Sequence, residues 1–180
     1  MQCHTDLDFF LFQSFVYWTV WGQTSKIMRA RLDGTEETVL IREGIPIPNA
    51  LALDESNKRL FWAGTDERKY GIIESVSLDG LNRNVTIYSQ GYHPFSLDIC
   101  EGFVYWADWG KNAVLRISSN GDREEMVITG LKKPMGVNIF LERTVEGNQG
   151  RTFKEIYLLT IDWVGTGLRL LMCCCILLKD

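Results

Sequence analysis

The chain has 180 residues, a formal net charge of −4 and a hydrophobic fraction of 46%. This composition supports one folded domain with a buried core and excludes a disordered chain. The small negative charge gives no attraction to nucleic-acid phosphates. Two histidines and five irregularly spaced cysteines form no ligand pattern for zinc. We therefore expect no metal, no cofactor and no nucleic-acid partner.

Residues 1–15 are apolar in their second half, from Phe9 to Phe12. They also contain Asp6 and Asp8, and they lack the basic opening and the small-residue cleavage site of a signal peptide. We expect this segment to be a leader outside the repeated part of the chain, and no signal peptide is visible in it.

A repeat of 44 residues follows, marked by an aromatic pair. Its tryptophans are 44 residues apart (62 − 18 and 106 − 62), and the pairs are Tyr17-Trp18, Phe61-Trp62 and Tyr105-Trp106. After each pair come an Asp-Gly or Asn-Gly dipeptide, a glycine, a proline and a short apolar run, in the same order each time. Self-similarity at this period is typical of a repeat architecture.

Within each repeat the apolar residues alternate with a period of two, which predicts β-strands. Asp-Gly and Asn-Gly favour hairpin turns, because both central residues of such a turn need a positive φ. Four short strands in 44 residues match one blade of a β-propeller, and we expect the tryptophans to pack between blades. Complete blades are predicted at about 50–88 and 96–128. Three outer strands in 15–42 and a lone inner strand at 136–140 would leave two unpaired edges.

The strings that carry the repeat are VYWTVWG (16–22), ARLDG (30–34), PNALALD (48–54), RLFWAG (59–64), HPFSLDICEG (93–102) and VYWADWG (104–110). They resemble the YWTD (class B) repeats of the low-density lipoprotein receptor family over about residues 15–143. The resemblance implies an all-β fold, a partial three-blade YWTD-type β-propeller of about twelve short antiparallel strands. It places the repeats at 16–59, 60–102 and 103–143, in register with the fourth to sixth blades of the family.

The sequence departs from the family pattern at one position of the motif. The aspartate of YWTD remains only as Asp108, whereas Val20 and Gly64 stand at the matching positions of the first two repeats. The family usually has six blades followed by an EGF-like module. We therefore expect the chain to be a fragment of a larger receptor.

Residues 144–180 form an apolar, cysteine-containing tail, which we expect to be irregular or helical. Asp162 and Arg169 interrupt its apolar segment, 156–178, and both are costly inside a bilayer. The uninterrupted run from Leu170 to Leu178 has nine residues, whereas a membrane span needs about 20. We expect membrane association only through the parent receptor, or weakly through 156–178.

The sequence contains no motif of a hydrolase nucleophile, a metalloprotease or a phosphate-binding loop, so no catalytic residue and no small-molecule substrate are predicted. The resemblance implies a non-catalytic extracellular module of an endocytic receptor, at the cell surface or in the endosome. Its partners would be protein ligands or other modules of the same receptor. A signalling co-receptor or matrix protein is the alternative parent, and a truncated product without independent activity is a third possibility.

By motif position, the residues implied to bind protein are Trp21, Arg68, Lys69, Tyr70, His93 and Trp109. For the two tryptophans the alternative is packing beneath a loop. His93 is either a turn residue before Pro94 or a proton switch, since imidazole titrates in the endosomal range. Asn84 begins an N-glycosylation sequence, Asn84-Val85-Thr86. The structural motif residues are Tyr17, Trp18, Phe61, Trp62, Tyr105, Trp106 and Asp108.

Overall fold

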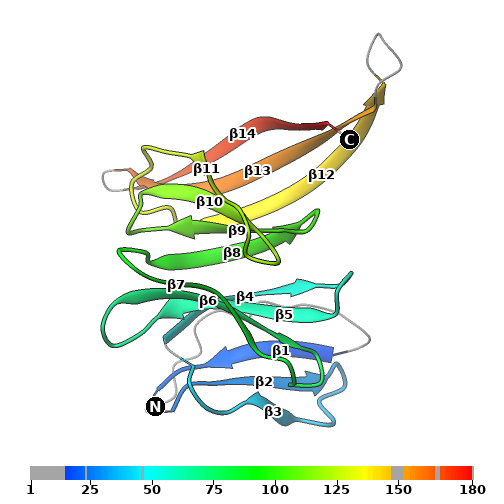
Figure 1. The fold of residues 1–180 in the computed structure, drawn as a ribbon, viewed down its shortest axis with the longest axis vertical. Helices are drawn as coiled ribbons and strands as arrows, with labels where there is room; N and C mark the ends of the chain where they lie inside the picture. The colour runs from blue at the N-terminus through cyan, green and yellow to red at the C-terminus, as the bar shows by residue number, and fades with distance from the viewer. Residues whose placement is uncertain (1–14, 23, 46, 147–151, 165–166, 180) are drawn as a thin grey trace.

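The computed structural model describes residues 15–22, 24–45, 47–146, 152–164 and 167–179, which form four antiparallel sheets (Figure 1). The first sheet contains β1 (Phe15–Val20), β2 (Lys26–Arg31) and β3 (Thr38–Ile41). The second contains β4 (Ile47–Asp54), β5 (Arg59–Thr65), β6 (Tyr70–Ser77) and β7 (Asn84–Gln90). The third contains β8 (Pro94–Cys100), β9 (Phe103–Asp108), β10 (Ala113–Ser118) and β11 (Glu124–Ile128). The fourth contains β12 (Gly136–Glu146), β13 (Thr152–Val164) and β14 (Gly167–Lys179).

The hairpin dipeptides form the predicted turns within the first three sheets. Their glycines have φ angles of 82°, 86° and 86°, at Gly34, Gly80 and Gly121. A side chain is strained in this left-handed region, and glycine is not. In the second turn the Asp79 carboxylate also accepts a hydrogen bond of 2.9 Å from the N–H of Leu81, which stabilises the turn locally.

The sheets stack face to face along the molecule in chain order (Figure 1). The first strand of the second sheet, β4, contacts the first strand of the third, β8, and β8 contacts the first strand of the fourth, β12. Hydrophobic clusters fill the spaces between sheets, with Leu60 and Val76 in the first space, Ile73 and Leu115 in the second and Val137 in the third. The chain is therefore an arc of propeller blades whose core lies between sheets.

Neighbouring residues of a strand point to opposite faces of the sheet, so the two residues of an aromatic pair pack into different spaces between sheets. Phe61 lies in the cluster shared by the second and third sheets, whereas Trp62 lies in the cluster shared by the first and second. Trp106 is likewise fully buried, between the second and third sheets. Trp18 is only half-buried, because it points away from the second sheet and no other described sheet lies on that side.

The expected offset between strands and repeats is confirmed. Three outer strands form the first sheet, two complete four-stranded sheets follow, and β12 starts the fourth as an inner strand. The expectation that this inner strand is alone, with an unpaired edge, is wrong, because β13 pairs with it. The expectation of an irregular or helical tail is not supported, because β12 pairs with β13 and β13 with β14. Thr152–Val164 is rich in β-branched and aromatic residues, which favour strands. The described residues contain no helix that could cross a membrane.

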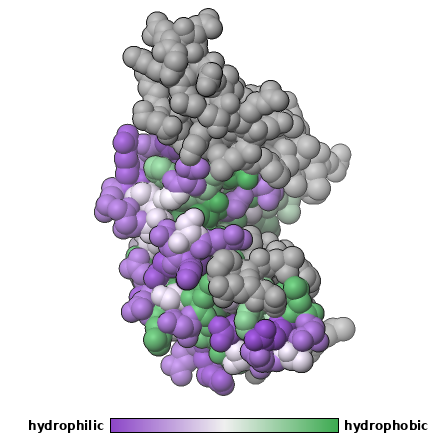
Figure 2. All heavy atoms as spheres, turned by 90° about the vertical axis from the view of Figure 1, so that its right-hand side faces the viewer, coloured by the Kyte–Doolittle hydropathy of each residue, from purple (hydrophilic) through white to green (hydrophobic). Residues whose placement is uncertain are grey.

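Large hydrophobic side chains are exposed in the turns at one end of the sheets. Leu32, in the turn after β2, is 54% exposed, and Leu81, in the turn after β6, is 62% exposed. Figure 2 views the molecule from this end and shows hydrophobic residues lying among hydrophilic ones over the lower sheets. We call this end the turn face; it also contains the turns after β4, β8 and β10.

Candidate protein-binding face

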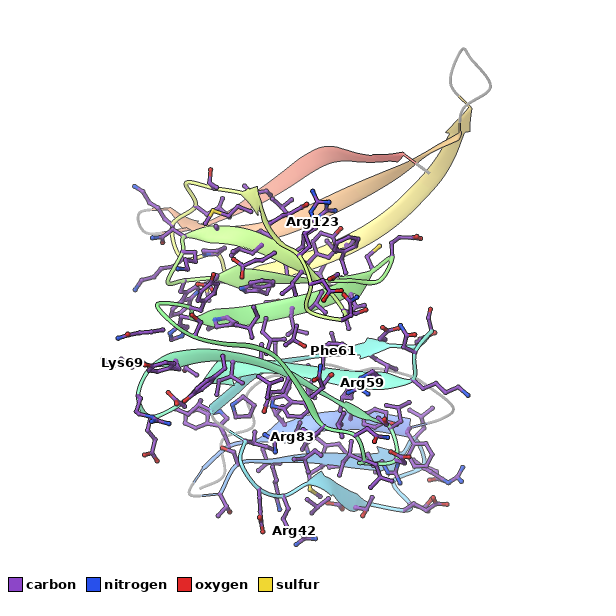
Figure 3. The ribbon with its side chains drawn as sticks, viewed as in Figure 1. Arg42, Arg59, Phe61, Lys69, Arg83 and Arg123 are labelled. Carbon is purple, nitrogen blue, oxygen red and sulfur yellow. The ribbon has the colours of Figure 1, made fainter. Side chains whose placement is uncertain are left out.

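Antiparallel pairing brings six loops to the end opposite the turn face. These loops follow β1, β5 and β9 and lead into β4, β8 and β12. We call this end the loop face; it comprises the described residues of 21–25, 42–46, 66–69, 91–93, 109–112 and 129–135. The six residues predicted to bind protein lie in these loops or next to them. Figure 3 shows Lys69 projecting at this end of the second sheet, away from Arg59.

Asp108 is a buried residue that holds together the loop-face end of the third sheet. Its carboxylate is fully buried and accepts hydrogen bonds from the backbone N–H groups of His93 (3.0 Å) and Lys111 (2.9 Å). The indole Nε1 of Trp106 donates a third hydrogen bond, of 3.0 Å. The one surviving motif aspartate thus joins the entrance of β8, the loop after β9 and the tryptophan in the core.

Trp109 lies half-buried above this carboxylate. Its ring stacks on those of His93 and Phe95, with centroid distances of 5.3 and 4.4 Å, and its Nε1 donates a 2.9 Å hydrogen bond to the carbonyl of Pro134. The Lys133 ammonium lies 5.4 Å from the ring centroid. Trp109 therefore packs two loops together and also contributes to an aromatic and cationic surface. Trp21, at the equivalent end of β1, is also half-buried.

The His93 imidazole titrates below the usual range. Its partial burial is the largest influence and lowers its pKa below the ordinary value of 6.5. The Asp108 carboxylate opposes this shift and the Lys133 ammonium adds to it. Free His93 is therefore neutral at neutral pH, and it accepts a proton only under more acidic conditions than an exposed histidine.

Arg68 and Tyr70 belong to a corner held together by Asp66. The Asp66 carboxylate accepts hydrogen bonds from the N–H groups of Arg68 (3.0 Å) and Tyr70 (2.8 Å) and from the Tyr88 hydroxyl (3.0 Å). These bonds, the one from Tyr70 first, lower the pKa of Asp66. The Tyr70 and Tyr88 rings stack at 5.1 Å. The neighbouring Lys69 is exposed and has a φ of 62°, so this corner presents a cation from an ordered loop.

Tyr92 links this corner to the Asp108 region. A Cβ atom on Gly71 would lie 2.5 Å from the Tyr92 Cβ, so β6 packs directly against Tyr92. The Lys111 ammonium lies 4.1 Å from the Tyr92 ring centroid, and the Tyr92 hydroxyl donates a 2.8 Å hydrogen bond to Glu124. Burial, followed by this glutamate, raises the pKa of Tyr92 to about 12. Tyr92 therefore connects the second sheet to the loops of the third sheet.

A groove of about 340 Å³ lies between the loops of the first and second repeats. Its residues are Gly22, Ser25, Gly44, Ile45, Ile47, Asp66, Glu67 and Ile72. The isoleucines give it an apolar part, and Ile47 is 47% exposed. Asp66 lines the groove and also accepts the hydrogen bond from the Arg68 N–H, so the groove lies next to the Arg68 corner. This groove can accept an apolar side chain of a partner beside charged groups.

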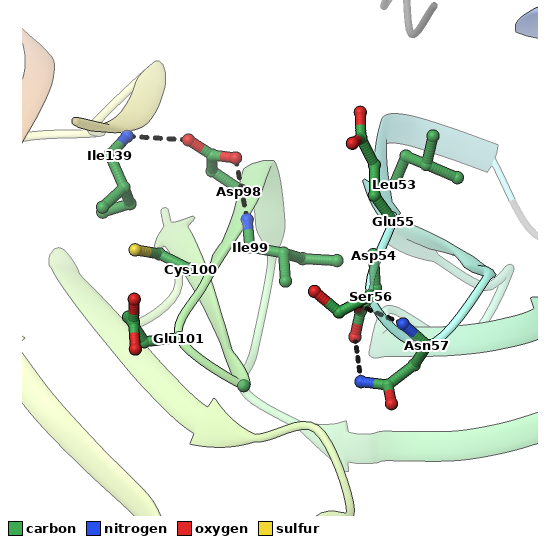
Figure 4. A pocket seen from close by; sticks show the side chains of 11 residues that line it. Leu53, Asp54, Glu55, Ser56, Asn57, Asp98, Ile99, Cys100, Glu101 and Ile139 are labelled. Atoms are coloured by element: carbon green, nitrogen blue, oxygen red, sulfur yellow. Dashed lines mark hydrogen bonds between the residues drawn. The ribbon is translucent and has the colours of Figure 1, made fainter. Parts of the chain in front are cut away.

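A second, larger hollow, of about 620 Å³, lies at the turn face (Figure 4). Its four carboxylates belong to Asp54, Glu55, Asp98 and Glu101. Asp54 accepts a 3.0 Å hydrogen bond from the N–H of Asn57, and Asp98 accepts one of 2.7 Å from the N–H of Ile139 on β12. Burial raises the pKa of Asp98. Both aspartates thus hold backbone in place, and within the described residues no group of three or more potential ligands could hold a metal ion.

Several residues that the sequence did not predict also shape the loop face. Asp66, Tyr88, Tyr92 and Lys111 were not predicted, although each contacts a predicted residue or its loop. Tyr92 directly precedes the HPF string, and this position next to a motif was the available sequence signal for it. Asn84 is exposed at the start of β7, near the turn face, and so lies apart from the predicted binding residues.

Comparisons with known proteins agree with this geometry. The family model of the low-density lipoprotein receptor repeat class B matches residues 14–55. The vitellogenin receptor Yl of Drosophila melanogaster is 28% identical over 125 residues, covering 69% of this chain and 6% of that receptor. The low-density lipoprotein receptor-related protein 5-like protein of Homo sapiens is 31% identical over 121 residues, covering 67% of this chain and 47% of that protein. The chain thus spans less than half the length of each relative.

Solved structures show the same fold. Nidogen, from a nidogen/laminin complex, has a TM-score of 0.56 at 24% identity, covering 66% of this chain and 44% of that one. A gluconolactonase from Xanthomonas campestris has a TM-score of 0.62 at 13% identity, covering 91% and 55%. At these identities the likeness concerns the fold alone. Together with the repeat model and the receptor relatives, it establishes that the chain carries class B (YWTD) repeats of the low-density lipoprotein receptor family, folded as part of a β-propeller.

Proposed function

We propose that the chain is a non-catalytic extracellular module that binds protein through its loop face, as part of an endocytic receptor at the cell surface or in the endosome. The module spans the three repeats, 16–59, 60–102 and 103–143. Its partner is an extracellular protein ligand or another module of the same receptor. The observation that carries the proposal is the gathering of all six motif-derived residues at one end, beside a groove that is partly apolar.

The chemistry of the loop face suits a protein partner. Half-buried aromatic rings at Trp109 and Tyr92 are held rigidly by hydrogen bonds, and rigid aromatic anchors contribute strongly to protein interfaces. Arg68, whose side chain is 77% exposed, and Lys69 add positive charge. Charge at the rim of an interface increases the rate and selectivity of association. The names of the relatives, which are receptors, support the same proposal.

A pair of lysines offers a matched test. Lys69 and Lys58 are both exposed and both have a positive φ, of 62° and 53°, but Lys69 lies at the loop face and Lys58 at the turn face of the same sheet. We expect Lys69→Glu to weaken binding about tenfold, which corresponds to about 1.4 kcal/mol, and Lys58→Glu to leave it unchanged.

The measurement is saturable binding of the fluorescently labelled full chain to animal cells, with unlabelled chain as competitor. Equal thermal stability of the two variants shows that the fold is retained. Equal weakening by both variants, or the absence of saturable binding by the unmodified chain, would contradict a binding role for the loop face.

A further inference from the structure

The sequence contains a single Asn-X-Ser/Thr triplet, Asn84-Val85-Thr86. Asn84 is exposed and begins β7, the edge strand of the second sheet. Such a triplet also arises by chance, so its presence alone decides nothing. The structural position of its third residue is more informative.

Thr86 is the extra residue of a β-bulge. Ile73 pairs with Ile87 and Glu74 with Val85, so Thr86 has no counterpart on β6. The same bulge occurs at the same place in the other two repeats. In the first the extra residue is Leu40, between Val39 and Ile41, and in the third it is Val127, between Met126 and Ile128.

The three bulge residues differ in a way that folding does not explain. Leu40 and Val127 are apolar and pack against the hydrophobic clusters between sheets. Thr86 has nearly the shape of valine, but its hydroxyl oxygen is buried and has no hydrogen-bond partner within the part of the chain that the structure describes. A buried hydroxyl without a partner destabilises the folded chain. Valine, as found at 127, would suit this position better.

We infer that Asn84 is an N-glycosylation site, and that Thr86 carries its hydroxyl because the glycosyl transfer needs it before the strand folds. In the reaction the Asn84 amide nitrogen forms a bond to the anomeric carbon of a lipid-linked oligosaccharide diphosphate. The bond from that carbon to the diphosphate breaks, the lipid diphosphate leaves, and the transferring enzyme takes up the amide proton.

The position of Asn84 suits a permanent glycan. It lies at the turn-face end of β7, and the seven residues of that strand place it about 20 Å from the loop face. The glycan would cover a strand edge flanked by Leu81 and Val85, which are 62% and 54% exposed. Exposed edges with apolar side chains promote association. The inference rests on the extracellular setting of the proposed function, and it keeps the proposed binding surface uncovered.

The direct test is translation of the full chain, behind a cleavable signal sequence, in the presence of microsomes. We expect one glycan, removed by endoglycosidase, on the unmodified chain and on Thr86→Ser. Asn84→Gln and Thr86→Val should both lose it completely. A positive control combines Asn84→Gln with Asp122→Thr, which completes a triplet that begins at the exposed Asn120.

Glycosylation of this control beside an unglycosylated natural chain would overturn the inference, because it would show that the chain reached the lumen and the transferring enzyme. That outcome leaves cell binding through Lys69 untouched, so the two proposals fail separately. A second measurement uses unglycosylated chains made in bacteria. There Thr86→Val should raise the melting temperature by about 2–4 °C. A fall in melting temperature would show that the Thr86 hydroxyl stabilises the fold, and would contradict the inference.

Discussion

The second and third sheets are built on the same repeat, yet they close their loop-face ends by different means. In the third sheet Pro94 pairs with Asp108, whose carboxylate binds three N–H groups. In the second sheet Pro48 pairs with Gly64, which has no side chain. Trp62, the counterpart of Trp106, is fully buried and its Nε1 has no hydrogen-bond partner among the described residues.

The second sheet uses an arginine from its outer turn instead. The Arg83 guanidinium lies 5.1 Å from the Trp62 ring centroid and forms a 2.6 Å ion pair with the buried Glu74. It also donates hydrogen bonds to the carbonyls of Glu43 (2.8 Å) and Gly44 (2.5 Å), which precede β4. A blade can therefore lose the motif aspartate when another side chain ties its strands to the preceding repeat.

Removal of the carboxylate from the third sheet should have the largest effect. Asp108→Ala leaves three donors without their acceptor, and each buried unpaired donor costs about 1–3 kcal/mol. We expect the free energy of unfolding to fall by about 3–5 kcal/mol, measured by urea denaturation. Asp79→Ala, in an exposed turn, is the control and should cost less than about 1 kcal/mol. Similar losses for both variants would mean that Asp108 is not a central support.

An aspartate placed at position 64, the matching position of the second sheet, should not stabilise that sheet. A Cβ atom on Gly64 would lie 2.1 Å from the carbonyl oxygen of Ile47, so the backbone already occupies the space that an aspartate needs. We expect Gly64→Asp to lower the free energy of unfolding by about 2–3 kcal/mol. Gly22→Ala is the control, since its added Cβ would meet no atom within 4 Å. A stabilised Gly64→Asp variant would show that the two sheets are interchangeable.

The two buried tryptophans provide a more direct comparison. Trp106→Phe and Trp62→Phe remove similar areas from the core, but among the described residues only Trp106 has an acceptor for its indole N–H, the Asp108 carboxylate. We expect Trp106→Phe to cost about 1 kcal/mol more than Trp62→Phe, measured by urea denaturation. A larger loss for Trp62→Phe would indicate that its indole N–H has a partner, such as an ordered water molecule.

The sequence predicts the backbone of this molecule better than its side-chain contacts. Period-two alternation and turn dipeptides are local signals, and they located the first eleven strands and the start of β12. The tail was harder, because an unbroken apolar run such as 170–178 has no period that separates strand from helix. Arg83 was missed for a different reason. It reaches carbonyls about 40 residues away, and only the packing of successive sheets brings these groups together.

The smallest expected effect concerns His93, which stands where Ile47 stands in the second sheet. The pKa of folded His93 is lowered, chiefly by burial, from the ordinary 6.5. Between the lowered value and 6.5 the unfolded chain therefore binds more protons than the folded chain, and the free energy of unfolding falls as the pH drops through this window. Because the ring is only half-buried, solvent screens the effect, and it should be smaller than the difference between the tryptophan variants.

His93→Ile introduces the residue found at the matching position of the second sheet. It tests whether the His93 imidazole causes this pH dependence of stability. It keeps the backbone N–H that binds Asp108, so the strand remains anchored while the titrating group is removed. We expect the variant to lose stability less steeply than the unmodified chain as the pH falls from about 7.5 to 5, which brackets the ordinary titration of imidazole. Urea denaturation at several pH values provides the measurement. Identical slopes in this range would assign the acid sensitivity to other groups and leave His93 as a packing partner of Trp109.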